Sequence, residues 1–153
     1  MSQPERPPEK RSGRAARRTL RPAPPIEFFI DRSLGRKHLA RALIERGLTV
    51  HTMASVYGER AAQKLADEDW LIDAGVQGWV VLLKDDRIRR RPAERDALMD
   101  AKVRAFCLTS AQLPASEQTA RFLGNLGRIR RQAAKPGPYI YGVYVDHLRR
   151  LWP

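Results

Sequence analysis

The sequence predicts an α/β fold, a single three-layer domain with a central, mostly parallel sheet. Short apolar runs rich in β-branched and aromatic residues alternate with segments whose apolar residues recur at helical spacing. In addition, residues 79–83 (WVVLL) form an uninterrupted apolar run, which is typical of a central parallel strand covered on both faces. Strands that alternate with helices favour parallel pairing through right-handed crossovers.

The elements follow from the same patterns, taken in chain order. We expect strands at 26–30, 48–53, 79–83, 105–108 and 139–145, and helices at 34–46, 59–74, 92–99 and 116–131. Gly47 suits the end of the first helix, and Pro92 suits the start of the third. Each strand is therefore followed by a helix, except the last.

Residues 1–25 differ in composition from the rest of the chain. They are rich in proline and arginine and carry seven Lys or Arg against two Glu, so +5 of the formal net charge of +12 lies here. A segment with so little apolar surface has little to bury, and we expect a disordered basic arm before a folded domain at 26–153.

The composition also narrows the class of protein. A chain of 153 residues, 42% hydrophobic and 30% charged, suits one soluble domain. It contains no apolar run near the roughly 20 residues that cross a bilayer, and no apolar signal core. Its one cysteine, Cys107, excludes an internal disulfide. We therefore expect a cytoplasmic protein without a membrane partner.

Basic residues dominate the charge, with 29 Lys and Arg against 17 Asp and Glu. Such an excess attracts polyanions, because each neutralised phosphate releases condensed counterions. A polyanion such as a nucleic acid is the partner that this balance favours. A solvated basic surface without a ligand is the alternative interpretation.

Acidic residues stand where two expected strands end. Asp31 follows the first strand, and Asp85 and Asp86 follow the third. Parallel strands end at one edge of the sheet, which is where ligands of open α/β sheets bind. Asp67 lies on the same helical face as Trp70, so it points along the apolar side of its helix.

Converging carboxylates repel one another unless a cation lies between them. Ligands that are all oxygen suit Mg²⁺ or Mn²⁺, and such an ion activates water for attack on phosphorus. We predict Asp31, Asp67 and Asp85 as catalytic residues and as metal ligands, with Asp86 and Glu94 as further candidate ligands. The structural alternative is that each acid caps a helix, ends a strand or, for Glu94, favours a helix dipole.

Basic residues flank these acids. The candidates for binding the substrate phosphates are Arg32, Arg36, Lys37, Arg87, Arg89, Arg90 and Arg91. Arginine pairs bidentately with phosphate, which suits it to grip a phosphodiester chain. Alternatively, these side chains neutralise the acidic cluster in a network of salt bridges.

Three segments together resemble a known family. Residues 29–35 (FIDRSLG), 67–71 (DEDWL) and 79–89 (WVVLLKDDRIR) resemble the three signature blocks of PIN-like domains, most nearly those of VapC-type toxins from toxin–antitoxin operons. The resemblance covers about residues 26–145. It implies a magnesium-dependent endoribonuclease that is held inactive by a cognate antitoxin and is often a homodimer.

The resemblance also implies roles for individual residues. Asp31, Asp67 and Asp85 correspond to the acidic cluster, with Asp86 or Glu94 as the candidate fourth member. A further acid expected after the fourth strand is missing, because Leu108 is followed by Thr109 and Ser110. The number of metal ions therefore stays open.

Two other functions compete with this one. A basic α/β module could bind nucleic acid or a protein partner without catalysis. A phosphatase similar to haloacid dehalogenases would carry a second aspartate two positions after Asp31, where this chain has Ser33.

Overall fold

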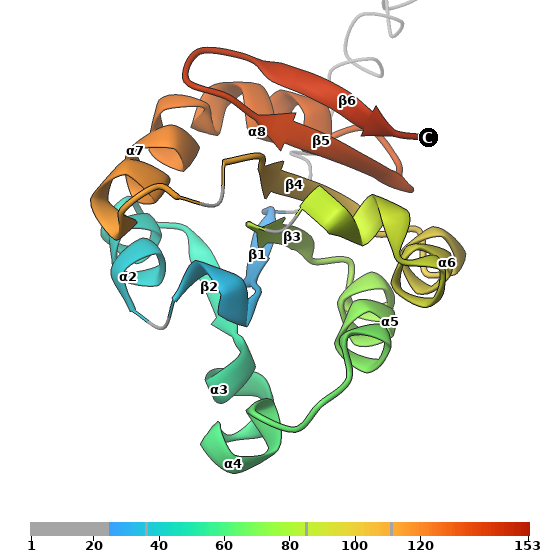
Figure 1. Cartoon of the computed structure of the whole chain (residues 1–153). Coiled ribbons are helices and arrows are strands. Elements are labelled where there is room, and N and C mark those ends of the chain that lie inside the picture. Colours follow the sequence, from blue (N-terminus) through green and yellow to red (C-terminus); the bar gives the residue numbers. More distant parts are fainter. Residues whose placement is uncertain (1–24, 36, 85, 111) are drawn as a thin grey trace, which may run out of the picture.

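The computed structural model describes residues 25–35, 37–84, 86–110 and 112–153, so nearly all of the predicted arm lies outside the described residues. The predicted fold class is confirmed: one six-stranded sheet, in the order β2-β1-β3-β4-β5-β6, lies between two layers of helices (Figure 1). All neighbouring strands pair in parallel except β5 and β6. The strands are β1 (Glu27–Ile30), β2 (Thr49–Thr52), β3 (Val80–Leu83), β4 (Arg104–Leu108), β5 (Tyr139–Val143) and β6 (Leu148–Trp152).

The helices lie on the two faces of this sheet. They are η1 (Arg32–Leu34), α2 (His38–Glu45), α3 (Met53–Tyr57), α4 (Glu59–Ala62), α5 (Asp67–Gln77), η2 (Asp86–Arg90), α6 (Pro92–Asp100), α7 (Ala115–Gly124) and α8 (Leu126–Ala133). On one face, α5 and α6 pack through Trp70, Leu71 and Leu98. On the other, α2, α7 and α8 pack through side chains such as Leu43 and Ile129. None of the helices within the described ranges is long and apolar enough to cross a membrane.

Three predicted helices are interrupted, and these predictions were wrong in their bounds. Gly35, with φ of 80°, separates η1 from α2 within the predicted helix 34–46. The predicted helix 59–74 divides into α4 and α5, and 116–131 divides into α7 and α8. Asn125 lies at the break between α7 and α8. Its side-chain amide is fully buried and donates to the carbonyl oxygens of Arg121 (2.9 Å) and Tyr144 (2.6 Å).

Two strand predictions also need correction. The strand expected at 48–53 ends at Thr52, whose side chain caps α3 by accepting from the backbone N–H of Ser55. The strand expected at 139–145 ends at Val143, and the chain then turns back to form β6, which was not predicted. Helix α6 begins at Pro92 as expected.

Aromatic packing fixes α5 against the sheet. The Phe29 ring of β1 stacks on Trp70 of α5, with centroids 5.3 Å apart, and on Trp79 at 5.7 Å. Phe29 and Trp70 are almost fully buried, so this contact removes a large apolar area from water. The start of α5 is thereby held beside the end of β1.

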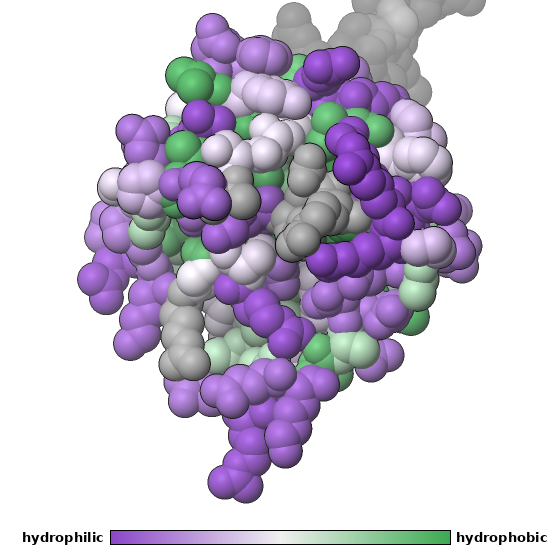
Figure 2. Space-filling view, viewed as in Figure 1, coloured by the Kyte–Doolittle hydropathy of each residue, from purple (hydrophilic) through white to green (hydrophobic). Residues whose placement is uncertain are grey.

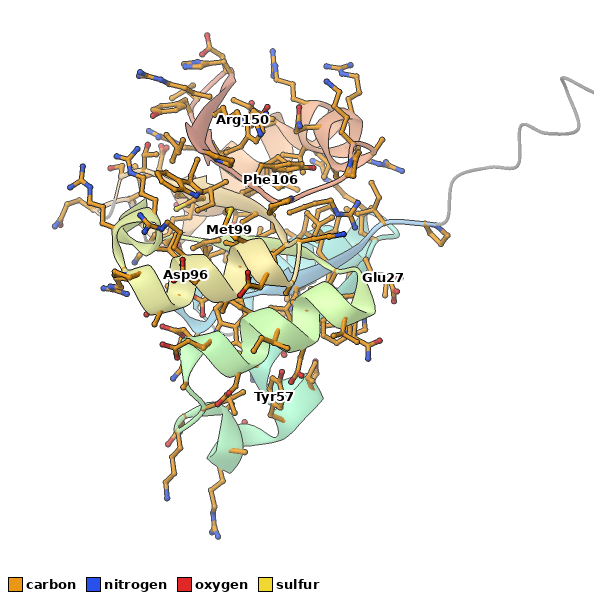
Figure 3. All side chains as sticks on the ribbon, turned by 90° about the vertical axis from the view of Figure 1, so that its right-hand side faces the viewer. Glu27, Tyr57, Asp96, Met99, Phe106 and Arg150 are labelled. Atoms are coloured by element: carbon orange, nitrogen blue, oxygen red, sulfur yellow. The ribbon has the colours of Figure 1, made fainter. Side chains whose placement is uncertain are left out.

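Helices α5 and α6 approach each other unusually closely near their carboxyl ends. A Cβ added at Gly75 of α5 would overlap the carbonyl oxygen and the Cβ of Ala101, the C-cap residue of α6. Figure 3 shows the two helices side by side across this face. Glycine is required here because the two backbones leave no room for a side chain.

The strand register brings the carboxyl ends of four strands to one edge. Ile30 of β1 pairs with Leu82 of β3, Leu82 pairs with Phe106 of β4, and Phe106 pairs with Tyr141 of β5. The residues that follow these strands therefore line up along the edge. This edge carries the candidate site.

Candidate active site

A pocket of about 320 Å³ opens where β1 and β3 end. Three acidic residues line it, each from a different segment: Asp31 after β1, Asp67 at the start of α5, and Glu94 in the first turn of α6. The other lining residues are Arg32, Ser33, Leu65, Ala66, Trp70, Leu83, Ile88 and Arg91. Two of the predicted catalytic residues and the predicted ligand Glu94 thus share one pocket.

Asp31 is the most deeply buried of the three acids, with 8% of its surface exposed. Its backbone N–H donates to the Leu82 carbonyl oxygen (3.0 Å), which continues the pairing of β1 with β3. Its Oδ2 accepts a 2.6 Å hydrogen bond from the Ser33 hydroxyl. Its Oδ1 is buried and has no hydrogen-bond partner within the described part of the chain. A buried carboxylate oxygen without a partner is costly, so this atom is suited to a positive ligand.

The pKa of Asp31 lies above its ordinary value of 3.8. Burial raises it most, because the charged form loses solvation, and the negative charge of Asp67 raises it further. The hydrogen bonds from Ser33 act in the opposite direction. A cation in the pocket would offset both effects that raise the pKa.

Ser33 links the ends of β1 and β3. Its hydroxyl donates to Asp31 Oδ2 and accepts from the backbone N–H of Lys84 (3.1 Å), the residue directly before Asp85. Asp31 also caps η1 by accepting from the Ser33 backbone N–H, which is the structural role that the sequence allowed for this acid. The link depends on the pairing of two strands that are far apart in sequence, so no local pattern could predict it.

Asp67 is oriented by its own helix. The indole N–H of Trp70, one turn later, donates to Asp67 Oδ1 (2.8 Å), and the Arg32 guanidinium lies 3.8 Å from the same oxygen. The Asp67 side chain is 33% exposed, so it lies at the rim of the pocket. The prediction that it points along the buried side of the helix agrees with this contact.

Arg32 makes internal contacts in addition. Its guanidinium donates to the carbonyl oxygens of Leu65 (2.6 Å) and Gln63 (3.4 Å), both in the segment before α5. This connects η1 to the start of α5. Contact of Arg32 with a substrate stays a prediction, because these two hydrogen bonds leave further N–H donors of the guanidinium.

Glu94 lies deeper in the pocket than its position in a first helical turn suggested. Its side chain is 15% exposed and forms an ion pair with Arg91 at 3.5 Å. Burial raises the pKa of Glu94 above its ordinary value, the nearby Asp67 raises it further by its charge and by a side-chain hydrogen bond, and Arg91 lowers it. Glu94 and Asp67 are therefore close neighbours.

Among the other predicted site residues that the structure describes, Arg91 reaches the pocket, where it pairs with Glu94. Asp85 and Arg36 lie outside the described residues, as do the side chains of Asp86 and Arg87 in η2. Arg90 and Lys37 are exposed, while Arg89 and Arg91 are half-buried. Within the described ranges, no three Asp, Glu, His or Cys side chains are close enough to hold a metal ion by themselves.

The donor set nevertheless fits a hard divalent cation. The pocket offers carboxylate oxygens and a hydroxyl, which are the ligands that Mg²⁺ and Mn²⁺ prefer. Asp31 Oδ1 is the oxygen that gains most from such an ion, because it is buried and unpaired within the described residues. The residues that would hold it are Asp31 with Asp67, completed by further acids of this edge.

Comparison with known proteins places this geometry in context. A family described as "PIN like domain" matches residues 26–110. A Mycobacterium tuberculosis protein named "Putative ribonuclease VapC45" is 37% identical over 124 residues, which cover 81% of this chain and 90% of that protein. No solved structure matches the chain significantly.

Proposed function

The chain belongs to the PIN-like domain family, and on that basis we propose that it is a metal-dependent endoribonuclease that hydrolyses RNA phosphodiesters. The observation that supports the proposal best is the buried, unpaired Oδ1 of Asp31 in a pocket shared with Asp67 and Glu94. A purely structural acid would have its buried oxygens paired inside the chain.

The cation would be Mg²⁺ or Mn²⁺, which supplies an activated water and charge neutralisation at the phosphate when bound. Asp31, Asp67 and Asp85 would hold it. Glu94 is a stronger candidate for the fourth ligand than the sequence suggested, because its side chain reaches the pocket beside Asp67. Asp86 remains a candidate on sequence alone.

The remaining residues position these acids and bind the substrate. Ser33 and Trp70 orient Asp31 and Asp67 through hydrogen bonds. The basic residues at 87–91, with Arg36 and Lys37, would contact the RNA phosphates on both sides of the scissile bond. Their positive charge would hold the polyanion against the repulsion of the acidic pocket.

We also propose a cellular role, as the toxin of a toxin–antitoxin pair acting in the cytoplasm. The support is the 37% identity to a protein named as a VapC ribonuclease. A cognate antitoxin would hold the enzyme inactive, and two copies would form a homodimer. Expression of the chain alone should arrest growth, and coexpression of a DNA-binding protein encoded by an adjacent gene should relieve the arrest. Unimpaired growth would contradict the toxin role.

The test of the activity is cleavage of RNA by the purified full chain. We expect cleavage with Mg²⁺ or Mn²⁺, its loss in EDTA, and its loss in Asp31→Asn and Asp85→Asn. Asp96→Asn is the matched control, because Asp96 is an exposed acid on α6, labelled in Figure 3. If the chain binds RNA in a salt-sensitive way without turnover, and Asp31→Asn changes nothing, the non-catalytic binding module is the correct interpretation.

A further inference from the structure

The turn between β5 and β6 carries an aromatic pair that the acidic pocket does not explain. The rings of Tyr144 and His147 stack in parallel, with centroids 4.7 Å apart and an interplanar angle of 4°. The His147 side chain is 58% exposed, and Val145 between them is 69% exposed. Tyr144 itself is half-buried, so His147 is the more exposed ring of the pair.

This pair is built into the fold. The buried amide of Asn125 donates to the Tyr144 carbonyl oxygen (2.6 Å), and the Tyr144 N–H donates to the His147 carbonyl oxygen (2.9 Å). His147 Nδ1 lies 2.9 Å from Asp146 Oδ1, which orients the imidazole. The Tyr144 end of the turn is thus fixed to the body of the domain, and His147 is fixed to Tyr144.

The pair lies at the same edge of the sheet as the acidic pocket. Tyr144 follows β5, and β5 runs parallel to β4, β3 and β1. Three strand intervals separate the ends of β1 and β5, which amounts to roughly 14 Å. A single strand of RNA can span that distance.

The pair also lies on the same face of the sheet as the pocket. A Cβ at Gly142 would meet the Tyr144 ring, the Thr109 methyl group and Leu151, and Leu151 packs with the core beneath α5 and α6. Trp70, which lines the pocket, belongs to that same core. The Tyr144 ring lies close to the space that a side chain at position 142 would occupy, so glycine at this position leaves room for the ring.

Positive charge accompanies the rings. Arg149 pairs with Gly142 across the β5–β6 ladder and is exposed. Directly paired residues of antiparallel strands share a face, so Arg149 points to the same face as Gly142. The hydrogen bond with His147 lowers the pKa of Asp146 most, and the charge of Arg128 on α8 lowers it further. Figure 2, drawn from the same side as Figure 1, shows hydrophilic residues mixed with pale and hydrophobic ones at the top of the molecule, where β5 and β6 lie. A ring face beside arginines is the combination that binds single-stranded nucleic acid.

We propose that Tyr144 and His147 form a stacking platform for a base of single-stranded RNA, away from the scissile phosphodiester, and that Arg149 contacts the adjoining phosphate. This rests on the proposed ribonuclease function, since it assigns part of the same substrate to a second subsite. The platform would favour RNA whose bases are unpaired at that distance from the cut. Stacking tolerates any base, so it selects single strands more than sequence.

The first experiment measures binding of a single-stranded RNA oligonucleotide to the full chain in EDTA, where cleavage is stopped. We expect Tyr144→Ala to weaken binding about tenfold, the size of one base–aromatic stacking contact, while Tyr144→Phe keeps it within about twofold. Arg149→Ala should reduce the salt dependence of binding. Arg60→Ala is its matched control, because Arg60 is an exposed arginine on α4, at the far end of the molecule in Figure 1. Equal affinity of Tyr144→Ala and the wild type would overturn the platform.

The second experiment separates this proposal from the proposed function. In Mg²⁺, Tyr144→Ala should raise KM for a long single-stranded RNA and leave kcat unchanged, and it should leave cleavage of a dinucleotide unchanged. An equal loss on both substrates would overturn the platform, because it would indicate damage to the catalytic pocket. Absence of cleavage by the wild type would contradict the ribonuclease instead, and the binding experiment would still decide whether the rings contact RNA.

Discussion

The Ser33 hydroxyl donates a 2.6 Å hydrogen bond to Asp31 Oδ2, and within the described residues the other oxygen of that carboxyl has no partner. The two oxygens of one side chain therefore differ: one is fixed to the chain, and the other is buried without a partner among the described residues. Removal of the Asp31 charge should therefore raise the stability of the metal-free protein and lower its activity.

Asp31→Asn should abolish RNA cleavage and at the same time stabilise the metal-free protein. The amide has the same shape but no charge to desolvate, so we expect the free energy of unfolding in EDTA to rise by about 1 kcal/mol. Chemical denaturation measures the stability, and a cleavage assay measures the activity. Asp96→Asn, on the exposed side of α6, should change neither. A lower stability of Asp31→Asn would show that the charge is compensated inside the chain.

The stability gap between the wild type and Asp31→Asn should depend on pH. The pKa of Asp31 is raised in the folded state above its ordinary value of 3.8, so between these two values the folded protein binds more protons than the unfolded chain. The free energy of unfolding of the wild type therefore falls as pH rises through that window. In EDTA, the gap should be small below the ordinary value and should reach its full size above the folded-state pKa. A gap that does not change with pH would contradict the role assigned to burial.

Divalent cations should offset the cost of burying the charged Asp31 carboxylate. Binding to the folded state alone stabilises it by an amount that grows with the logarithm of the cation concentration. We expect the melting temperature of the wild type to rise with added Mg²⁺ or Mn²⁺, and that of Asp31→Asn to rise much less. Thermal unfolding at several cation concentrations measures this without any substrate. Identical shifts in both proteins would place the cation elsewhere.

Arg32→Ala should lower stability and cleavage without changing the salt dependence of RNA binding. The guanidinium holds the Leu65 carbonyl oxygen at 2.6 Å and lies beside Asp67, so its loss should cost about 1 kcal/mol and loosen the start of α5. Arg90→Ala, at an exposed arginine of η2, should instead reduce the slope of log affinity against log salt by about 1. A reduced slope in Arg32→Ala would show that Arg32 contacts phosphate, as the sequence suggested.

Glu94→Gln distinguishes a ligand from a residue that merely favours the helix dipole. A ligand role predicts a loss of metal affinity of about tenfold or more, whereas the dipole alone is worth only about 0.3–1 kcal/mol of stability. Titration of cleavage rate against Mn²⁺ concentration measures the affinity. Asp96→Asn on the same helix is again the control. Unchanged Mn²⁺ dependence in Glu94→Gln would remove Glu94 from the site.

The local patterns of the sequence were sufficient for most of the fold. The apolar run at 79–83 and the alternating strands predicted the parallel sheet, because burial on both faces leaves a clear signature. β6 was missed because Arg149 and Arg150 interrupt its apolar residues. Its position depends on pairing with β5, and the Trp152 ring lies 4.6 Å from the Arg95 guanidinium. Such contacts have no local signature.

The site was predictable in part, where local strand and helix patterns fix the position of a residue. Asp31 and Asp67 could be placed because one follows an apolar strand and the other shares a helical face with Trp70. The internal use of Arg32, the link made by Ser33 and the depth of Glu94 could not be predicted, since each depends on how separate elements pack. The placement of Asp85 stays a prediction, outside the described residues.

Gly75 determines more than the packing of two helices. The carboxyl ends of α5 and α6 meet at Gly75 and Ala101. The amino ends of the two helices carry Asp67 and Glu94, which line the pocket. Because the helices run in the same direction, any side chain at position 75 pushes them apart and carries the two carboxyls with them. The width of the acidic pocket, and with it the fit of the proposed cation, should thus change through a substitution that replaces none of the acids.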